Sequence, residues 1–289
     1  MTLAQIEKPY QVITDRMLAL LEQGTVPWQQ PWDSATGVPR NLFSQRPYTG
    51  INVWLLTAMG YASPFWATFN QVIQAGGRVR KGTKGVPVVF WKVYTKDDAE
   101  TGEADKRFVL RYYTVFNAVQ LAGLALPEIP VIPPHCSPIE RCDTLVRTMP
   151  HRPEIIHGHQ RAFYKPATDT LHMPIPACFR SPEAYYATLF HELTHSTGHR
   201  SRLNRKTLTD LCLFGDPEYA QEELVAEMGA TYLCGVCGIA NATLANSAAY
   251  LQNWMQAVRN DPTMLVHAAA QAQKAADHIQ DLQPPTEGA

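Results

Sequence analysis

The amino-acid sequence predicts an α+β protein of two domains. Apolar stripes with helical spacing and runs of branched and aromatic residues occur in both halves of the chain, which indicates helices and strands in each half. Residues 127–138 contain five prolines in twelve positions, which predicts an extended linker. We therefore expect a small α+β domain over 1–126, followed by a mostly helical domain with a short antiparallel sheet over 139–289.

The first domain opens with apolar residues three and four positions apart, which predict an amphipathic helix that Gly24 ends. A proline-rich loop follows, held by Trp28 and Trp32. Two further helices and two β-rich strands come next, with a polar hairpin tip at 97–106 between the strands. The helices are expected over 6–21, 51–59 and 64–74, and the strands over 86–94 and 108–116.

The second domain shows short β-rich segments between longer helical patterns. Strands are expected around 154–157, 161–164 and 170–173. Helices are expected over 139–149 and from Pro182, Ala220, Ser247 and Pro262 onward, with a frayed tail after Gln283.

Composition excludes several classes of protein. The chain has 289 residues, of which 45% are hydrophobic and 18% charged, so it can bury a large core and is neither disordered nor collagen-like. No apolar run approaches the ~18 to 20 residues of a spanning helix, and the first residues lack a signal peptide's apolar stretch. Six scattered cysteines do not form a disulfide scaffold. We expect a cytoplasmic protein with no membrane partner.

The charge is unevenly distributed along the chain. Residues 1–126 hold 13 Lys and Arg against 9 Asp and Glu, whereas the remainder holds 12 against 17. Five of the six tryptophans also lie in the first part. This asymmetry predicts different functions for the two domains.

The second domain contains the pattern H-E-x-x-H at 191–195. On a helix, His191 and His195 share one face and can reach the same divalent ion, and Glu192 lies beside the water that it would deprotonate. Gly198 ends the helix, and the position of the third histidine in the long-spacer subclass is Ser201, which excludes that subclass. The pattern predicts a zinc site, with Mn or another divalent ion as an alternative.

A catalytic zinc takes a third protein ligand. Downstream, the run 222–227 opens an apolar helix, and Glu223 is followed three residues later by the small Ala226. This resembles the arrangement of glutamate-type zincins, which implies Glu223 as the third ligand. Glu227, one turn on, is the alternative ligand or a carboxylate that orients a histidine. Glu222 is expected to be a solvated charge near the start of the helix.

Three further features of this domain have competing interpretations. His199 is a ligand, a donor to the transition state or, as the preferred interpretation, a surface residue after the helix. Cys234 and Cys237 have C-x-x-C spacing but lie in an apolar helical stretch, which favours packing over metal binding. By analogy with zincins, the strands near 161–164 and 170–173 would present an edge to an extended peptide.

The first domain contains a basic loop that leads into a predicted strand. Its cations are Arg78, Arg80, Lys81 and Lys84, and its glycines allow backbone amides to approach phosphates. Aromatic residues expected in exposed loops would stack bases, with asparagines as polar partners. These candidates are Trp28, Trp32, Tyr48 and Trp66 with Asn52 and Asn70. The alternative is a solvated turn beside tryptophans that pack the core.

Several segments, in order, resemble ArdC-type antirestriction proteins, whose amino-terminal domain also occurs in certain plasmid primases. In the first domain these are 27–32, Asn41, 48–52, 64–69, 76–82 and 88–92. In the second domain they are 162–164, 173–174, 191–199 and 219–227, so the resemblance covers nearly the whole chain.

The resemblance implies a single-stranded DNA-binding domain fused to a zincin-like metallopeptidase domain, encoded on conjugative plasmids or other mobile elements. It implies a protein that protects incoming DNA from restriction in a bacterial recipient and that acts on an unknown protein or peptide substrate. Two alternatives stay open: a DNA-binding shield whose metal domain is proteolytically inert, and a plain cytoplasmic metallopeptidase.

Overall fold

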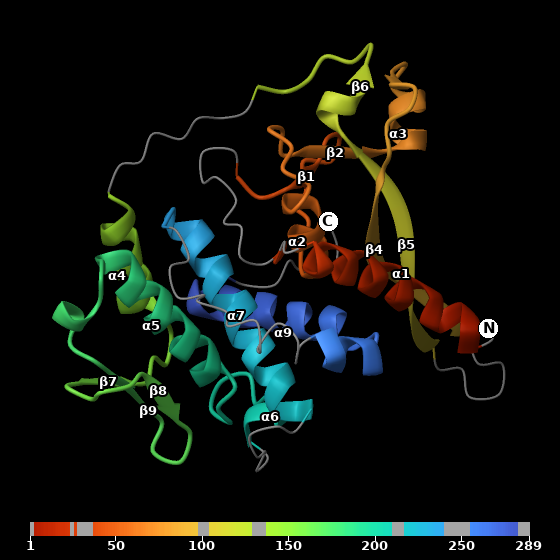
Figure 1. Ribbon diagram of the computed structural model, residues 1–289. Helices are drawn as coiled ribbons and strands as arrows, with labels where there is room; N and C mark the ends of the chain where they lie inside the picture. Colours follow the sequence, from red (N-terminus) through yellow and green to blue (C-terminus); the bar gives the residue numbers. More distant parts are fainter. Residues whose placement is uncertain are drawn as a thin grey trace. The chain divides into compact units, whose positions relative to one another are not determined.

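The chain divides into two compact units in the computed structural model, residues 1–25 with 38–129 and residues 26–37 with 130–289 (Figure 1). The structure describes residues 3–23, 26–27, 37–97, 104–128, 137–209, 217–239 and 255–282. Most of the expected linker, Trp28, Trp32 and the helix start at Ser247 lie outside these ranges. The domain limits at 126 and 139 therefore stay predictions.

The first unit is built on a four-stranded sheet of order β1-β2-β5-β4. Strand β1 (Arg40–Asn41) runs parallel to β2 (Phe65–Thr68), which is antiparallel to β5 (Ala104–Asn117). The long hairpin of β4 (Val86–Asp97) and β5 runs side by side in register from Val86 opposite Val115 onward (Figure 1). A second ladder pairs β3 (Arg78–Val79) with β6 (Leu121–Ala122).

Helices cover the sheet of the first unit. The apolar stripe of α1 (Leu3–Glu22) buries Ile13 and Met17 completely, as the spacing predicts. Helix α2 (Ile51–Thr57) lies at the outer edge of β4, where the Asn52 amide donates to the Val89 carbonyl (2.7 Å) and accepts from the Val89 N–H (2.8 Å). Asn52 thus satisfies the backbone groups that a further strand would pair.

The helix expected over 64–74 is wrong in its first part. Phe65–Thr68 is strand β2, and α3 (Phe69–Gln74) begins only after it. Phe65 and Ala67 pack into the core between the sheet and α3, and this tertiary packing outweighs the helical spacing. Thr68 and Gln71 form a capping box that starts the helix.

The second unit is mainly helical. Helix α5 (Pro182–Thr197) packs against α7 (Pro217–Cys237), and α9 (Met264–Ile279) packs against both (Figure 1). Helix α4 (Pro138–Thr148) contacts all three. The buried face of α9 is rich in alanine, which allows close approach to α7. A one-turn helix, α6 (Lys206–Thr209), lies against α7.

A three-stranded sheet of order β7-β9-β8 completes the second unit. Strand β9 (Thr170–Met173) is parallel to β7 (Glu154–His157) and antiparallel to β8 (Phe163–Lys165), so the sheet is mixed and the expectation of an antiparallel sheet is wrong for one pair. The two-domain α+β fold class is confirmed. No helix among the described residues is long and apolar enough to span a membrane.

Candidate functional site

Helix α5 places the histidine pair. Ser181 caps its start by accepting from the Ala184 N–H, and Pro182 occupies the first turn, where its missing N–H costs nothing. The helix ends at Gly198, where a Cβ would come within 2.9 Å of Leu208 and 3.0 Å of the Arg205 guanidinium. A glycine at this position therefore lets the segment that carries Arg205 pack on the end of α5.

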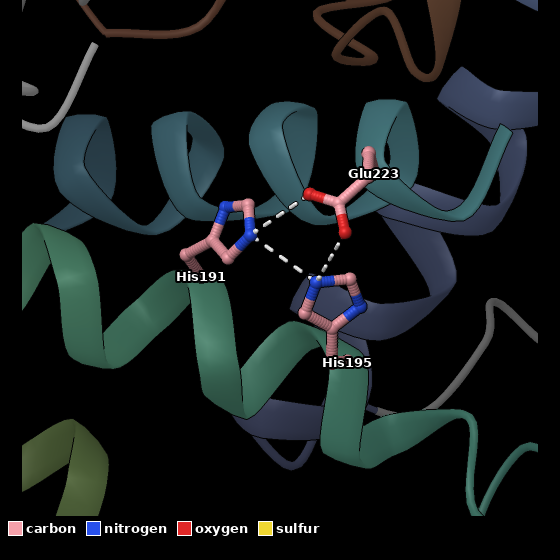
Figure 2. A group of neighbouring side chains, drawn as sticks. All are labelled: His191, His195 and Glu223. Carbon is pink, nitrogen blue, oxygen red and sulfur yellow. Dashed lines mark hydrogen bonds and ion pairs between the residues drawn. The ribbon is translucent and has the colours of Figure 1, made fainter. Parts of the chain in front are cut away.

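His191 and His195 lie one turn apart, and their side chains are 16% and 12% exposed. Their Nε2 atoms are 3.1 Å apart. The carboxylate of Glu223, on α7, faces both: its oxygens are 3.5 Å from His191 Nε2 and 3.7 Å from His195 Nε2. Figure 2 shows the two imidazoles pointing from α5 toward this carboxylate. The donor atoms all lie within 4.8 Å of one another.

Close packing of α7 on α5 brings Glu223 to the histidines. At Gly229 a Cβ would lie 2.5 Å from Cγ2 and 2.7 Å from Oγ1 of Thr194, which is fully buried on α5. Only glycine permits this approach. Gly229 was not singled out from the sequence, although an isolated glycine inside a helical pattern is a signal of close packing.

The expectation that Glu222 is a solvated charge is wrong. Glu222 is 4% exposed and accepts from Arg205 Nη2 (2.6 Å), Arg205 Nε (3.1 Å) and the Thr207 hydroxyl (2.5 Å). Its other contact is His195 Nδ1 at 3.2 Å. Arg205 also donates to the Thr194 carbonyl, which ties it to α5. Glu222 is therefore placed to hold the His195 ring with Nε2 directed at Glu223.

Glu227 lies farther from the pair. Its Oε1 is 4.0 Å from His191 Nδ1, and its Oε2 is buried without a hydrogen-bond partner among the described residues. Burial raises its pKa to about 7. Of the two carboxylates considered as third ligand, Glu223 faces both Nε2 atoms and Glu227 lies beside the far side of one ring.

The electrostatics of the cluster favour a cation. Burial lowers the pKa of His191, but the hydrogen bond with Glu223 and the charges of Glu192 and Glu227 outweigh it and raise that pKa to about 9. Burial raises the pKa of Glu223, yet the contacts with His191 and His195 and a hydrogen bond from Tyr219 bring it to about 2. Two imidazoles and an ionised carboxylate are the donors that hold zinc and similar ions, so these residues fit a divalent metal.

A cavity of about 440 Å³ opens beside the cluster. Glu192 is 8% exposed and lines it together with the histidines and Glu223. Tyr219 of α7 lines it too; it lies in the 219–227 segment that carries the family resemblance but was not among the predicted site residues. Residues 162–164, from the edge strand β8 and the residue before it, also line the cavity.

The remaining candidates of the second unit lie elsewhere. His199 contacts the Ser201 hydroxyl at 2.7 Å and lies 3.8 Å from Asp169, outside the donor cluster. Cys234 and Cys237 are buried in the core of this unit together with Cys142.

Three of the DNA-binding candidates in the first unit are buried. Tyr48 and Asn52 are 4% exposed and Trp66 is 1% exposed, so the expectation that they lie in exposed loops is wrong. Trp66 is covered because β2 is an interior strand of the sheet, and Asn52 bonds the edge of β4. Trp32 lies outside the described residues. The basic loop is exposed at all four of its cations, Arg78, Arg80, Lys81 and Lys84.

Both units match known protein families. Residues 7–116 match the N-terminal domain of the anti-restriction factor ArdC, and residues 140–271 match a zincin-like metallopeptidase domain. The crystal structure of the metal-free antirestriction protein ArdC from plasmid R388 is 39% identical, with a TM-score of 0.75, over 95% of this chain and 99% of that one. The chain belongs to the ArdC family of antirestriction proteins.

Other relatives extend the comparison. A Mn(II)-bound structure of the R388 ArdC protein is 37% identical with a TM-score of 0.75, over 94% of this chain and 97% of that chain. The protein y4eC of Sinorhizobium fredii is 36% identical over 93% of this chain and 90% of its own length. A DNA primase TraC of Escherichia coli is 36% identical over 96% of this chain, which spans only 27% of that primase. The ArdC architecture thus also occurs within a longer protein.

Proposed function

We propose that this ArdC-family protein binds single-stranded DNA through its first unit and protects DNA entering a bacterial cell from restriction. The observation that carries the proposal is the match to an antirestriction protein along nearly the full length of both chains. The excess of cations in residues 1–126 supports it, because phosphates attract a basic domain. The site of action would be the cytoplasm of the recipient in conjugation.

We further propose that His191, His195 and Glu223 hold one divalent ion in the second unit. The convergence of their donor atoms supports this ligand set. Zinc is the ion that H-E-x-x-H sites ordinarily hold, and the Mn(II)-bound relative makes manganese the alternative. Glu222 and Arg205 would keep His195 oriented toward the ion.

The chemistry proposed for this site is hydrolysis of a peptide bond. A bound divalent ion supplies Lewis acidity for the carbonyl and for water. The Glu192 carboxylate, which lines the cavity, takes the proton of the attacking water and delivers it to the leaving amine. The β8 edge beside the cavity offers backbone groups with which an extended substrate would pair.

In the first unit, the exposed cations of the basic loop would contact phosphates. Their role is proposed from exposure and charge, and DNA strands of unrelated sequence should bind alike because phosphates carry no sequence information.

A transfer assay tests the proposed function. A plasmid is conjugated into recipient cells with and without an active restriction system, each with or without this protein. We expect the protein to raise transfer into the restricting recipient and to leave transfer into the other recipient unchanged. Equal transfer with and without the protein in a panel of restricting recipients would contradict the proposal. Protection that survives Glu192→Gln would favour the shield with an inert metal domain.

A further inference from the structure

The β4–β5 hairpin exposes four large aromatic side chains. Phe90 and Trp91 on β4 are 43% and 51% exposed, and Tyr112 and Tyr113 on β5 are 40% and 44% exposed. Adjacent exposed aromatic residues on one short stretch of a sheet mark a binding surface more often than isolated ones do.

The register of the hairpin sorts these residues onto two faces. Phe90 lies opposite Arg111, and Tyr113, two residues further on, lies opposite Val88. Because side chains alternate along a strand, Phe90, Lys92, Arg111 and Tyr113 share one face, and Trp91 and Tyr112 lie on the other. We name the first group the Phe90 face.

The Phe90 face forms a short row of rings. The centroids of Phe90 and Tyr113 are 6.0 Å apart, and Phe90 lies 5.9 Å from the buried ring of Tyr48. Tyr48 therefore packs against Phe90, one of the two exposed rings. On the opposite face, the ring centroids of Trp91 and Tyr10 of α1 are 6.5 Å apart. Trp91 therefore already has an aromatic partner within the unit.

The Phe90 face also carries positive charge, which indicates a ligand with negative charge. Lys92 and Arg111 are exposed, and the sequence contains no acidic residue in 86–92 or 109–117. Cations beside exposed aromatic rings suit a ligand with flat bases and a phosphate backbone, which is the combination used for single-stranded nucleic acid.

We propose that the Phe90 face binds single-stranded DNA, with bases stacked on Phe90 and Tyr113 and phosphates held by Lys92 and Arg111. The proposal rests on the DNA-binding function proposed above and adds a base-stacking surface that is separate from the basic loop. In this proposal the aromatic platform consists of Phe90 and Tyr113 and not of the buried Tyr48 and Trp66. Tyr48 packs against Phe90.

The test is binding of the full-length protein to a fluorescent oligo(dT) strand, followed by anisotropy at several salt concentrations. For Tyr113→Leu and Phe90→Leu we expect a loss of affinity of about 5- to 150-fold with an unchanged salt slope, since stacking releases no counterions. Arg111→Gln should flatten the slope of log K against log salt by roughly 0.7. Tyr113→Phe keeps a ring and should bind within about twofold of the parent protein.

Tyr112→Leu is the matched control, because Tyr112 is exposed to the same degree on the other face. Tyr112→Leu should bind the oligonucleotide with the parent's affinity. All variants should have the parent's unfolding temperature, measured by circular dichroism. The proposal is overturned if the parent binds DNA and Phe90→Leu and Tyr113→Leu bind it equally well. It is also overturned if Tyr112→Leu loses as much affinity as Phe90→Leu and Tyr113→Leu do. A parent protein that binds no oligonucleotide would instead contradict the proposed function itself.

Discussion

Four glutamates surround the histidine pair, and their environments give them different roles. Glu223 faces both imidazoles, whereas Glu222 is neutralised by Arg205 and touches only the outer nitrogen of His195. Glu192 lines the cavity, and Glu227 keeps a buried oxygen without a partner among the described residues. The four side chains are chemically identical, so the roles proposed for them as ligand, base and orienting group follow from their positions on the two helices.

The first prediction concerns the general base. Glu192→Gln is close to isosteric but cannot accept a proton, so it should retain the metal and the fold and lose peptidase turnover by at least about 100-fold. Hydrolysis of labelled casein and elemental analysis of the same sample measure the two properties. A variant that cleaves casein at the parent's rate would remove Glu192 from the mechanism.

The second prediction concerns the buried Glu222–Arg205 pair. Glu222→Gln should destabilise the second unit by on the order of 3 kcal/mol at pH 7, because it leaves the buried guanidinium without its counter-charge. Urea unfolding with a chelator present measures the difference between variant and parent. Lys206→Gln, an exposed neighbour, is the control and should change stability little.

The same pair predicts a pH dependence. Burial raises the pKa of Glu222, but the hydrogen bonds with His195 and Arg205 outweigh it and lower the pKa to about 2, against about 4.3 in an unfolded chain. A depressed pKa contributes stability above the unfolded value and loses it as pH falls toward the folded value. The gap between parent and Glu222→Gln should therefore shrink between about pH 4.3 and 2. A gap that is constant over this range would contradict the assignment.

The packing of α7 on α5 determines the distance between Glu223 and the histidines. Gly229→Ala would gain about 1 kcal/mol of helix propensity, but its Cβ would overlap the buried Thr194 side chain. We expect the overlap to prevail, with stability lower by about 1 kcal/mol or more and metal binding weakened because the helices separate. Thermal unfolding and metal titration measure both effects.

Thr194→Ala removes the atoms that the new Cβ would meet. In the double variant the destabilisation caused by Gly229→Ala should be smaller than in the parent background, a coupling that a double-mutant cycle detects. Strictly additive effects would show that the two helices do not meet through these residues.

The elements with strong local signals were predictable from the sequence. The H-E-x-x-H helix begins at Pro182 as expected, and the 86–94 and 108–116 strands appear within the longer β4 and β5. The strand at residues 65–68 was not predictable from the sequence. Its aromatic run fits the face of a helix and a buried strand equally well, and only the pairing with β5 decides between helix and strand.

The two units of the molecule differ in charge as well as in fold, and the basic loop belongs to the first. Neutralising Arg80 and Lys84 together should weaken binding to unrelated single strands about equally. The slope of log K against log salt should flatten by roughly 0.7 for each phosphate that the variant no longer neutralises. Fluorescence anisotropy at several salt concentrations measures it; unchanged affinity and slope in the folded variant would exclude the loop.

The candidate site was predictable where one helix carries the signal and unpredictable where distant segments meet. Helical spacing alone places His191 and His195 together. The burial of Glu222 depends on Arg205, 17 residues away in the chain and in a segment with no pattern of its own. In the first unit, Tyr48 and Trp66 are buried whereas Phe90 and Tyr113 are exposed, and this difference depends on packing between segments that are far apart in the sequence.

The central claim about this ArdC-family protein is that two helices of its second unit form a single metal site. Elemental analysis of the purified protein and of four variants tests it most directly. We predict one divalent ion per chain in the parent, loss of the ion in His191→Ala, His195→Ala and Glu223→Ala, and higher occupancy in Glu227→Ala than in Glu223→Ala. Full occupancy in both histidine variants would contradict the site, and the reverse order of the two glutamate variants would make Glu227 the third ligand.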